Sequence, residues 1–213
     1  MKAKRRWLFA AAILLVVPLL FATYSRGDRD EAQFQWDLIS VDASINLRAG
    51  GQDSAGAADN SFITLTGSGT FVTPAGGDEG EGSGSAVTGG GTWETFSPGP
   101  NSVPTGSGTY KVTRLVRFTL ANCTVPTCVS GFGGTDLVLP ESQARAGLAV
   151  LEIKYSDESR GVLVVSCGLN GTPPSVFEGI VASKDSVEFW NQNPFNAASN
   201  ATIFHKIQRA DEN

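Results

Sequence analysis

GSGTYKVTRLVRFTL, residues 106–120, is the stretch that decides the fold. From Tyr110 to Leu120 apolar and polar residues nearly alternate, which is the period of a β-strand with one buried face. One predicted face carries the apolar side chains Val112, Val116, Phe118 and Leu120. The opposite face is mostly polar, with Lys111, Thr113, Arg117 and Thr119. Arg114 interrupts the apolar face and Leu115 the polar one, so we expect this strand to be partly covered on both sides.

The glycine-rich start of this stretch recurs twice. The pattern Gly-x-Gly-Thr-aromatic occurs as GSGTF at 67–71, GGGTW at 89–93 and GSGTY at 106–110. Glycine permits a tight turn, and threonine followed by an aromatic residue suits the start of a strand. Because the spacing is irregular, the pattern predicts consecutive strands of an antiparallel meander and not a solenoid repeat.

A hairpin is the second strong signal. Residues 149–155 and 161–167 read as strands joined by a polar turn at 156–160, and the run Val162–Val165 is continuously apolar, as in a strand buried on both faces. Further strands are expected near 35–47, 61–72, 86–96, 175–183, 186–190 and 201–207, with a single helical turn at 141–145. The predicted fold class is all-β: a single antiparallel β-barrel or β-sandwich of about eight to ten strands after an N-terminal signal or anchor helix.

The N-terminus indicates export. A cationic stub, Lys2 to Arg6, precedes the uncharged run WLFAAAILLVVPLLFA from Trp7 to Ala22, which is typical of a secretory signal peptide. As a helix this run rises about 24 Å, somewhat less than the roughly 30 Å of a bilayer core. Cleavage as a signal peptide and retention as a membrane anchor both stay open. We expect a secreted or extracytoplasmic protein that touches the membrane only through residues 7–22, if these are uncleaved.

The remaining chain reads as one acidic domain. The predicted division is a signal or anchor at 1–22, a polar linker at 23–33, an all-β domain at 34–209 and a tail at 210–213. Without residues 1–22 the chain keeps 12 basic and 21 acidic residues, a net charge of −9. Such a surface repels phosphates, so nucleic acid is not an expected partner.

The three cysteines favour a structural role. Cys123 and Cys128 enclose a four-residue loop, and in an oxidising compartment we expect them to form a disulfide. Cys167, at the end of an apolar strand, is expected to be buried and unpaired, and its pairing with either of the others is the alternative. Three cysteines and one distant histidine do not supply the four donors of a zinc site, so no metal or other cofactor is predicted.

Candidate catalytic residues are weak. The only histidine, His205, lacks a Ser or Asp motif beside it, and we expect an ordinary strand residue at a sheet edge. Glu152, Glu178, Asp185 and Glu188 lie in or beside predicted strands, where two facing carboxylates could cleave glycosidic bonds. Solvent-facing positions are the favoured interpretation for all four, so no catalytic residue is predicted.

Aromatic and amide side chains are the best candidates for a ligand site: Trp93, Phe189, Trp190, Asn191 and Asn193. Adjacent strand residues point to opposite faces, so either Phe189 or Trp190 should lie outside. The sequence thus predicts an exported, bacterial-type cell-envelope or secreted β-domain, a non-catalytic binding or structural module for an unknown small ligand or envelope component. The alternatives are a surface adhesion or protein-interaction module and, third, a carboxylate-based hydrolase or isomerase on a small β-barrel.

Overall fold

The computed structural model describes residues 32–73, 78–80, 86–121, 134–169, 171–173, 176–192 and 201–207, and of residues 78–80 and 191–192 only the backbone. The predicted signal or anchor at 1–22, the linker up to residue 31 and the tail at 210–213 lie outside these ranges. Cys123, Cys128 and Asn193 also lie outside them, so the expected disulfide stays a prediction.

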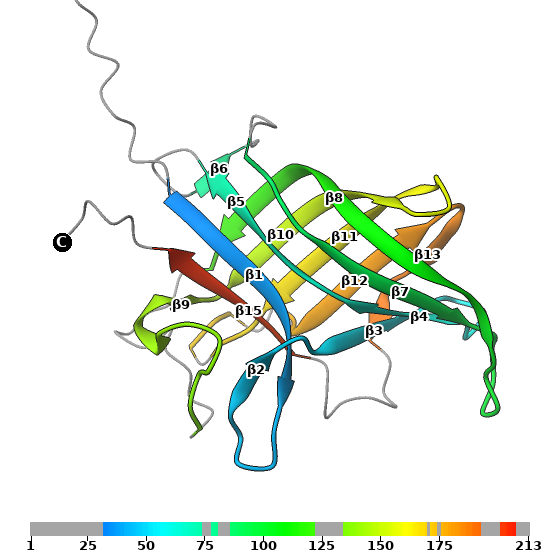
Figure 1. Ribbon diagram of the computed structural model, residues 1–213, viewed down its shortest axis with the longest axis horizontal. Helices are drawn as coiled ribbons and strands as arrows, with labels where there is room; N and C mark the ends of the chain where they lie inside the picture. Colours follow the sequence, from blue (N-terminus) through cyan, green and yellow to red (C-terminus); the bar gives the residue numbers. More distant parts are fainter. Residues whose placement is uncertain are drawn as a thin grey trace, which may run out of the picture.

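Strands are the dominant element of the described chain, and every strand pair among them is antiparallel (Figure 1). The strands are β1 (Ala32–Val41), β2 (Leu47–Ala49), β3 (Gln52–Gly56), β4 (Phe62–Thr66), β5 (Ser68–Thr73), β6 (Asp78–Gly80), β7 (Gly90–Phe96), β8 (Pro104–Leu120), β9 (Ala144–Arg145), β10 (Gly147–Tyr155), β11 (Arg160–Cys167), β12 (Gly179–Lys184), β13 (Val187–Phe189), β14 (Asn191–Gln192) and β15 (Ala201–Ile207). A 3-10 turn, η1 (Glu141–Gln143), falls where one helical turn was predicted. The all-β antiparallel fold class is confirmed.

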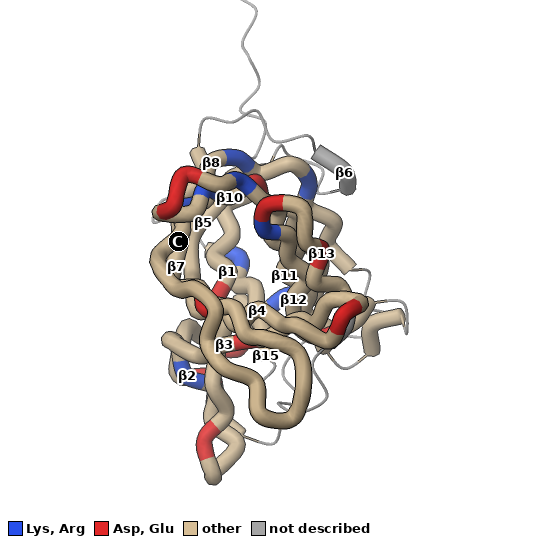
Figure 2. The backbone as a smooth tube through the Cα atoms, turned by 90° about the vertical axis from the view of Figure 1, so that its right-hand side faces the viewer, with Lys and Arg blue, Asp and Glu red and all other residues tan. Residues whose placement is uncertain are grey.

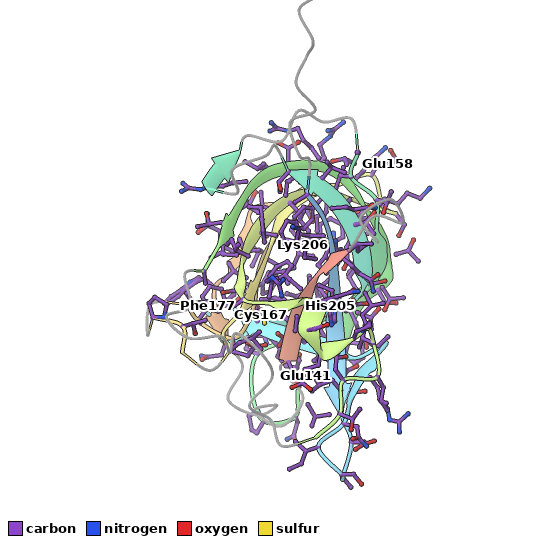
Figure 3. The ribbon with its side chains drawn as sticks, turned by 90° about the vertical axis from the view of Figure 1, so that its left-hand side faces the viewer. Glu141, Glu158, Cys167, Phe177, His205 and Lys206 are labelled. Atoms are coloured by element: carbon purple, nitrogen blue, oxygen red, sulfur yellow. The ribbon has the colours of Figure 1, made fainter. Side chains whose placement is uncertain are left out.

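All strands belong to one sheet, which curls back on itself. Its main path contains ten strands in the order β13-β12-β11-β10-β8-β7-β5-β1-β15-β9. One residue after β13, the chain continues as β14 and pairs with β3, which in turn pairs with β4 and through it with β7. The strands therefore surround a single interior filled with side chains, as in a barrel (Figure 3).

Aromatic rings fill the centre of this interior. Phe118 of β8 lies 4.7 Å from Phe34 of β1, 4.9 Å from Phe71 of β5 and 5.2 Å from Phe204 of β15, measured between ring centroids. The four rings come from strands far apart in sequence, and each is at most 3% exposed. Their mutual contact removes a large apolar area from water and joins opposite sides of the sheet.

The Gly-x-Gly-Thr-aromatic motifs lie on neighbouring strands, as predicted, because β5, β7 and β8 are adjacent in the sheet. Their aromatic residues Phe71, Trp93 and Tyr110 are all buried. The prediction that each motif opens a strand is wrong for the third, since Gly106 and Gly108 lie inside β8. There glycine serves packing: a Cβ on Gly108 would lie 2.9 Å from Nε1 of Trp93, and one on Gly106 would lie 3.2 Å from the same ring.

A second tryptophan repeats this arrangement. Trp36 of β1 pairs with Gly69 of β5, and a Cβ on Gly69 would lie 2.8 Å from the indole Nε1 and 2.2 Å from the carbonyl oxygen of Thr88. Each large indole thus occupies the space that the neighbouring glycine leaves free. Pairing a glycine with an aromatic residue across two strands is a known way to stabilise strongly curved sheets.

β-Bulges change the predicted faces of β8. Its pairing with β10 shifts register between Val150 and Leu151 and again between Glu152 and Ile153. Each shift adds one residue to β8, so the buried positions after Tyr110 and Val112 are Leu115 and Phe118, spaced by three instead of two. The prediction that Val116 shares the buried face is therefore wrong, and Leu115 takes its place.

β11 is covered on one face only. Leu163 and Val165 are fully buried, whereas Val162 is 37% exposed and Val164 is intermediate. The predicted burial of both faces of Val162–Val165 is wrong, because in the described part of the chain no second layer covers the outside of the sheet at β11. The predicted hairpin of β10 and β11 is present, with Lys154 paired to Arg160 next to the turn.

Replacing Gly69 by alanine should lower the free energy of unfolding by about 1–3 kcal/mol, the usual cost of overpacking a rigid core. The added Cβ would meet both the Trp36 ring and the backbone at Thr88, and neither can move freely. Urea unfolding followed by circular dichroism measures the change. The control is Thr70→Ala, which removes only an exposed hydrogen bond to Thr88; equal losses in the two variants would contradict the packing role of Gly69.

Candidate ligand-binding site

Lys184, at the end of β12, is the centre of a polar cluster at one mouth of the barrel. Its side chain is only 9% exposed, yet its ammonium group has three oxygen partners. Nζ donates to Oδ2 of Asp157 at 2.6 Å, to Oδ2 of Asp185 at 3.0 Å and to Oγ of Ser159 at 3.1 Å. Asp157 and Ser159 belong to the β10–β11 turn and Asp185 to the β12–β13 turn, so the ammonium group ties two hairpin ends together.

Aromatic rings form the inner wall of the cluster. Nζ of Lys184 lies 4.6 Å from the centroid of the Trp93 ring and 5.1 Å from that of Tyr155, which is within the range of cation–π attraction. The two rings meet edge to face, with 5.7 Å between centroids. The Tyr155 hydroxyl donates to the carbonyl oxygen of Ser183 at 2.8 Å, which fixes this ring beneath Lys184.

Lys184 and Asp157 stabilise each other in their ionised forms. Burial alone would lower the pKa of Lys184, but the hydrogen bonds that its ammonium group donates to Asp157 and Asp185 raise it overall. The hydrogen bond from Lys184, followed by that from Ser159, lowers the pKa of Asp157 to about 2. The ammonium group and the Asp157 carboxylate therefore stay charged at neutral pH and do not exchange protons with a bound molecule in the physiological range.

A pocket of about 400 Å³ opens beside the cluster. Its lining combines three kinds of side chain. Hydroxyl groups come from Ser61, Thr95 and Thr105, charges from Asp157, Lys184 and Asp185, and apolar surface from Trp93, Phe96, Val187 and Phe189, with Gly106 between them. Phe96 is held in place by stacking on Phe62, with ring centroids 4.5 Å apart and an interplanar angle of 11°.

The residues predicted for ligand binding divide between two places. Trp93 and Phe189 both line the pocket, although they are about a hundred residues apart in sequence. Trp190 is 56% exposed and outside the barrel while Phe189 is buried, so one of the two adjacent aromatics does lie outside. The backbone of Asn191 pairs with Gly56, and Asn193 lies outside the described residues.

Lys184 and Asp157 are the site residues that the sequence analysis missed. Residues 156–160 were recognised as a polar turn, but no local motif connects them to Lys184. In an antiparallel meander of four strands, such as β10 to β13, the first and the third turn lie at the same end of the sheet. The strand order alone would therefore have placed these two polar turns side by side.

His205 is a buried core residue with a distant partner. Its ring is fully buried, and Nε2 lies 2.8 Å from Oδ2 of Asp136, which is 69 positions away in sequence. The expectation of a ring at the sheet edge without an acidic partner is wrong, since the pair forms only through the fold. Burial raises the pKa of nearby Asp37, which accepts a hydrogen bond from Gln35. Because both His205 and Asp136 are enclosed, this cluster has no face from which to act on a ligand.

The carboxylates considered for catalysis do not converge. Glu152 pairs with Arg114 on the outside of β10, Glu188 is exposed, and Asp185 belongs to the Lys184 cluster. Glu178 is the exception to the expected solvent-facing positions. Its carboxylate receives backbone hydrogen bonds, and desolvation by burial, the largest cause, raises its pKa to about 7 despite them.

Cys167 is a free, buried thiol, and the two cysteines with which it was considered to pair, Cys123 and Cys128, lie outside the described residues. Burial raises its pKa, which disfavours the reactive thiolate.

Among the described residues, no three side chains of His, Cys, Asp or Glu are grouped closely enough to hold a metal ion. The same part of the chain contains no helix that is both long and apolar enough to cross a bilayer.

Basic and acidic positions lie next to each other around the turns near β8, β10 and β13 (Figure 2).

Comparison of the chain with protein-family models, with curated proteins and with solved structures finds no match. The pocket and its surroundings are thus the basis for an inference about function.

Replacing Lys184 by methionine, which keeps the apolar stem, should lower the free energy of unfolding by about 1–2 kcal/mol through lost cation–π and charged hydrogen bonds. The pKa of Asp157 should rise from about 2 toward its ordinary value of 3.8, as followed by carboxyl carbon chemical shifts in an NMR titration. The matched control is Lys154→Met, which removes a more exposed pair with Glu158 and should cost under about 0.5 kcal/mol. An unchanged Asp157 pKa in Lys184→Met would contradict the cluster.

Proposed function

We propose that this chain is an exported, non-catalytic binding module whose pocket beside Lys184 takes a small, hydroxyl-rich ligand of the carbohydrate class. The observation that supports it is the composition of the pocket lining, which combines three hydroxyl side chains and two carboxylates with aromatic residues. A pocket with apolar walls and a few convergent polar groups is the usual form of a small-ligand site.

A sugar ring matches this lining chemically. Its hydroxyl groups need partners that both donate and accept hydrogen bonds, as Ser61, Thr95 and Thr105 do, and carboxylates accept such bonds strongly. Its apolar ring faces need flat apolar surface, which Phe96 supplies in the lining of this pocket. A volume of about 400 Å³ lies within the range of small-ligand pockets.

Binding without catalysis is favoured by the electrostatics. A glycosidase-type acid must hold a proton near neutral pH, which requires a raised pKa. The pocket carboxylate Asp157 has a lowered pKa because Lys184 holds it in the charged form. The raised pKa values of Asp53 and Glu178 belong to groups that do not line this pocket.

Location outside the cytoplasm is part of the proposal. It rests on the cationic stub and the apolar run at residues 7–22, and on the acidic character of the remaining chain. Extracellular or periplasmic glycans, free or in the envelope, are the carbohydrates that such a module would meet.

The test is titration of the purified protein with glucose, N-acetylglucosamine, cellotetraose, maltotetraose and chitotetraose, by calorimetry and tryptophan fluorescence. The background variant Trp190→Phe removes the exposed indole, so that the pocket residue Trp93 contributes a larger share of the signal. We expect at least one of these probes to bind with a Kd of about 1 mM or tighter and to change the fluorescence. Heat and fluorescence that stay at the level of buffer for all five probes would overturn the carbohydrate assignment.

Two variants locate the site. Asp185→Asn keeps a residue that tolerates the observed positive φ of 55° but removes the charged acceptor, and should weaken binding about 10-fold or more. Thr105→Val should weaken it as well, since one hydroxyl partner is lost. The matched controls Glu188→Gln and Thr92→Val alter residues that do not line the pocket and should leave the Kd unchanged.

A further inference from the structure

Two strands of the barrel lie beside β11 and β12 without pairing with them. In the described sheet, β15 pairs only with β1 and β9, and β3 pairs only with β4 and β14. Cys167, at the end of β11, nevertheless contacts the backbone of Phe204 in β15. We call this boundary, with β11 and β12 on one side and β3 and β15 on the other, the seam.

Side chains replace the missing backbone ladder at the seam. Glu178 lies just before β12, and its Oε1 accepts a hydrogen bond of 2.6 Å from the backbone N–H of Thr202 in β15. Its Oε2 accepts another of 2.6 Å from the backbone N–H of Gly168, after β11. Thr202 also donates its hydroxyl to the carbonyl oxygen of Ser166 at 2.7 Å, so one glutamate and one threonine join β15 to the end of β11.

A second carboxylate approaches the seam from β3. Asp53 is 1% exposed; its Oδ1 accepts a hydrogen bond of 2.6 Å from the N–H of Ser54, and its Oδ2 has no hydrogen-bond partner. The backbone amide of Ile180 in β12 stabilises the charged form of Asp53, while the negative charge of Glu178 disfavours it. The titratable groups that face Glu178 are thus Asp53 from β3 and the thiol of Cys167 from β11.

The hydrogen bonds around Glu178 are compatible with a protonated carboxyl group. Oγ1 of Thr202 lies 3.1 Å from Oε1 of Glu178 and 2.7 Å from the carbonyl oxygen of Ser166, but a hydroxyl has only one hydrogen to donate. When that hydrogen goes to Ser166, a protonated Glu178 can donate to the Thr202 oxygen and complete a chain across the seam. An ionised Glu178 instead competes with Ser166 for the same hydrogen.

We propose that Asp53 and Glu178 form a proton-controlled latch: the seam is closed when they carry protons, and β15 and β3 loosen from β11 and β12 when both carboxylates are ionised. Loosening follows because two like charges would then lie in an enclosed region where solvent screens them poorly.

The pH range follows from the direction of the shifts. Desolvation by burial, as the largest cause, raises the pKa of Asp53 from 3.8 to about 7 and that of Glu178 from 4.5 to about 7. The folded protein thus binds more protons than the unfolded chain between the ordinary and the raised values. The stability that these groups confer is fully present below their ordinary pKa values and is lost as the pH rises through about 7.

The first experiment is urea unfolding of the full-length protein at pH 5.5 and pH 8.0, with the same ionic strength. We expect the urea midpoint of the wild type to be lower at pH 8.0 than at pH 5.5. In Asp53→Asn this difference should be about half as large. Comparison with the wild type removes the contribution of every group that the variant does not change. The control variant Glu152→Gln changes an exposed carboxylate of β10 and should keep the full pH dependence.

The second experiment locates the change at the seam. Amide hydrogen exchange is measured at pH 5.5 and 8.0 and corrected for the intrinsic effect of pH. The rate at Thr202 and Gly168 should increase at least tenfold more than the rate in the β10–β11 hairpin. Asp53→Asn should reduce this excess increase at the seam. Glu178→Gln cannot ionise and should remove the excess if it folds. If it does not fold, Asp53→Asn still tests the latch, because it keeps the hydrogen bonds that Glu178 and Thr202 make across the seam. An unfolding midpoint that is flat or rises with pH, or an excess exchange that is unchanged in Asp53→Asn, would overturn the latch.

Discussion

The indole of Trp93, held between the backbone of β8 and the ammonium group of Lys184, is the contact on which the shape of the barrel mouth depends. One neighbour of the ring is a stretch of β8 where Gly106 and Gly108 offer no side chain, and any Cβ there would come within 3.2 Å of the ring. Another neighbour is Lys184, whose Nζ lies 4.6 Å from the ring centroid. The glycines let the indole pack closely on the neighbouring strand, and the lysine brings the turns with Asp157 and Asp185 to the same place.

Buried ionisable side chains lie at both ends of β12, and the cost of removing each from water is offset to a different degree. At Lys184 the cation meets two carboxylates and two aromatic rings, so that burial is offset by attraction. Near the other end, Glu178 faces the like-charged Asp53, and backbone N–H groups only partly offset the loss of solvent. The first arrangement gives a rigid wall suited to binding, whereas the second gives a junction whose stability depends on protons.

The fold was predictable from local patterns wherever the strand period or a turn motif determined the structure. The strand at 110–120, the hairpin around residues 156–160 and the neighbouring positions of the three glycine motifs all follow from sequence. The exchange of Val116 for Leu115 in the core was not predictable, because bulges depend on the pairing of β8 with β10. The exposure of Val162 was missed for a related reason, since a sheet that encloses its own core leaves its outer face in water.

The candidate site was predictable only in part. Trp93 and Phe189 were selected for their aromatic character, but the sequence does not show that they share a pocket with Lys184 and Asp157. The buried pairs, His205 with Asp136 and Glu178 with Thr202, join residues far apart along the chain and appear only when the sheet has curled around its core. Charged residues of this kind look like surface positions in a sequence because their burial is decided by long-range contacts.

The contact between Lys184 and Trp93 can be observed directly by NMR spectroscopy of the protein in solution. A side-chain group held over an aromatic face experiences the ring current, so the terminal methylene protons of Lys184 should resonate upfield of those of the other lysines and show nuclear Overhauser effects to the Trp93 ring. Lysine signals that all coincide at the ordinary position, without any such effect, would show that the indole is not covered by Lys184 and would contradict this account of the barrel mouth.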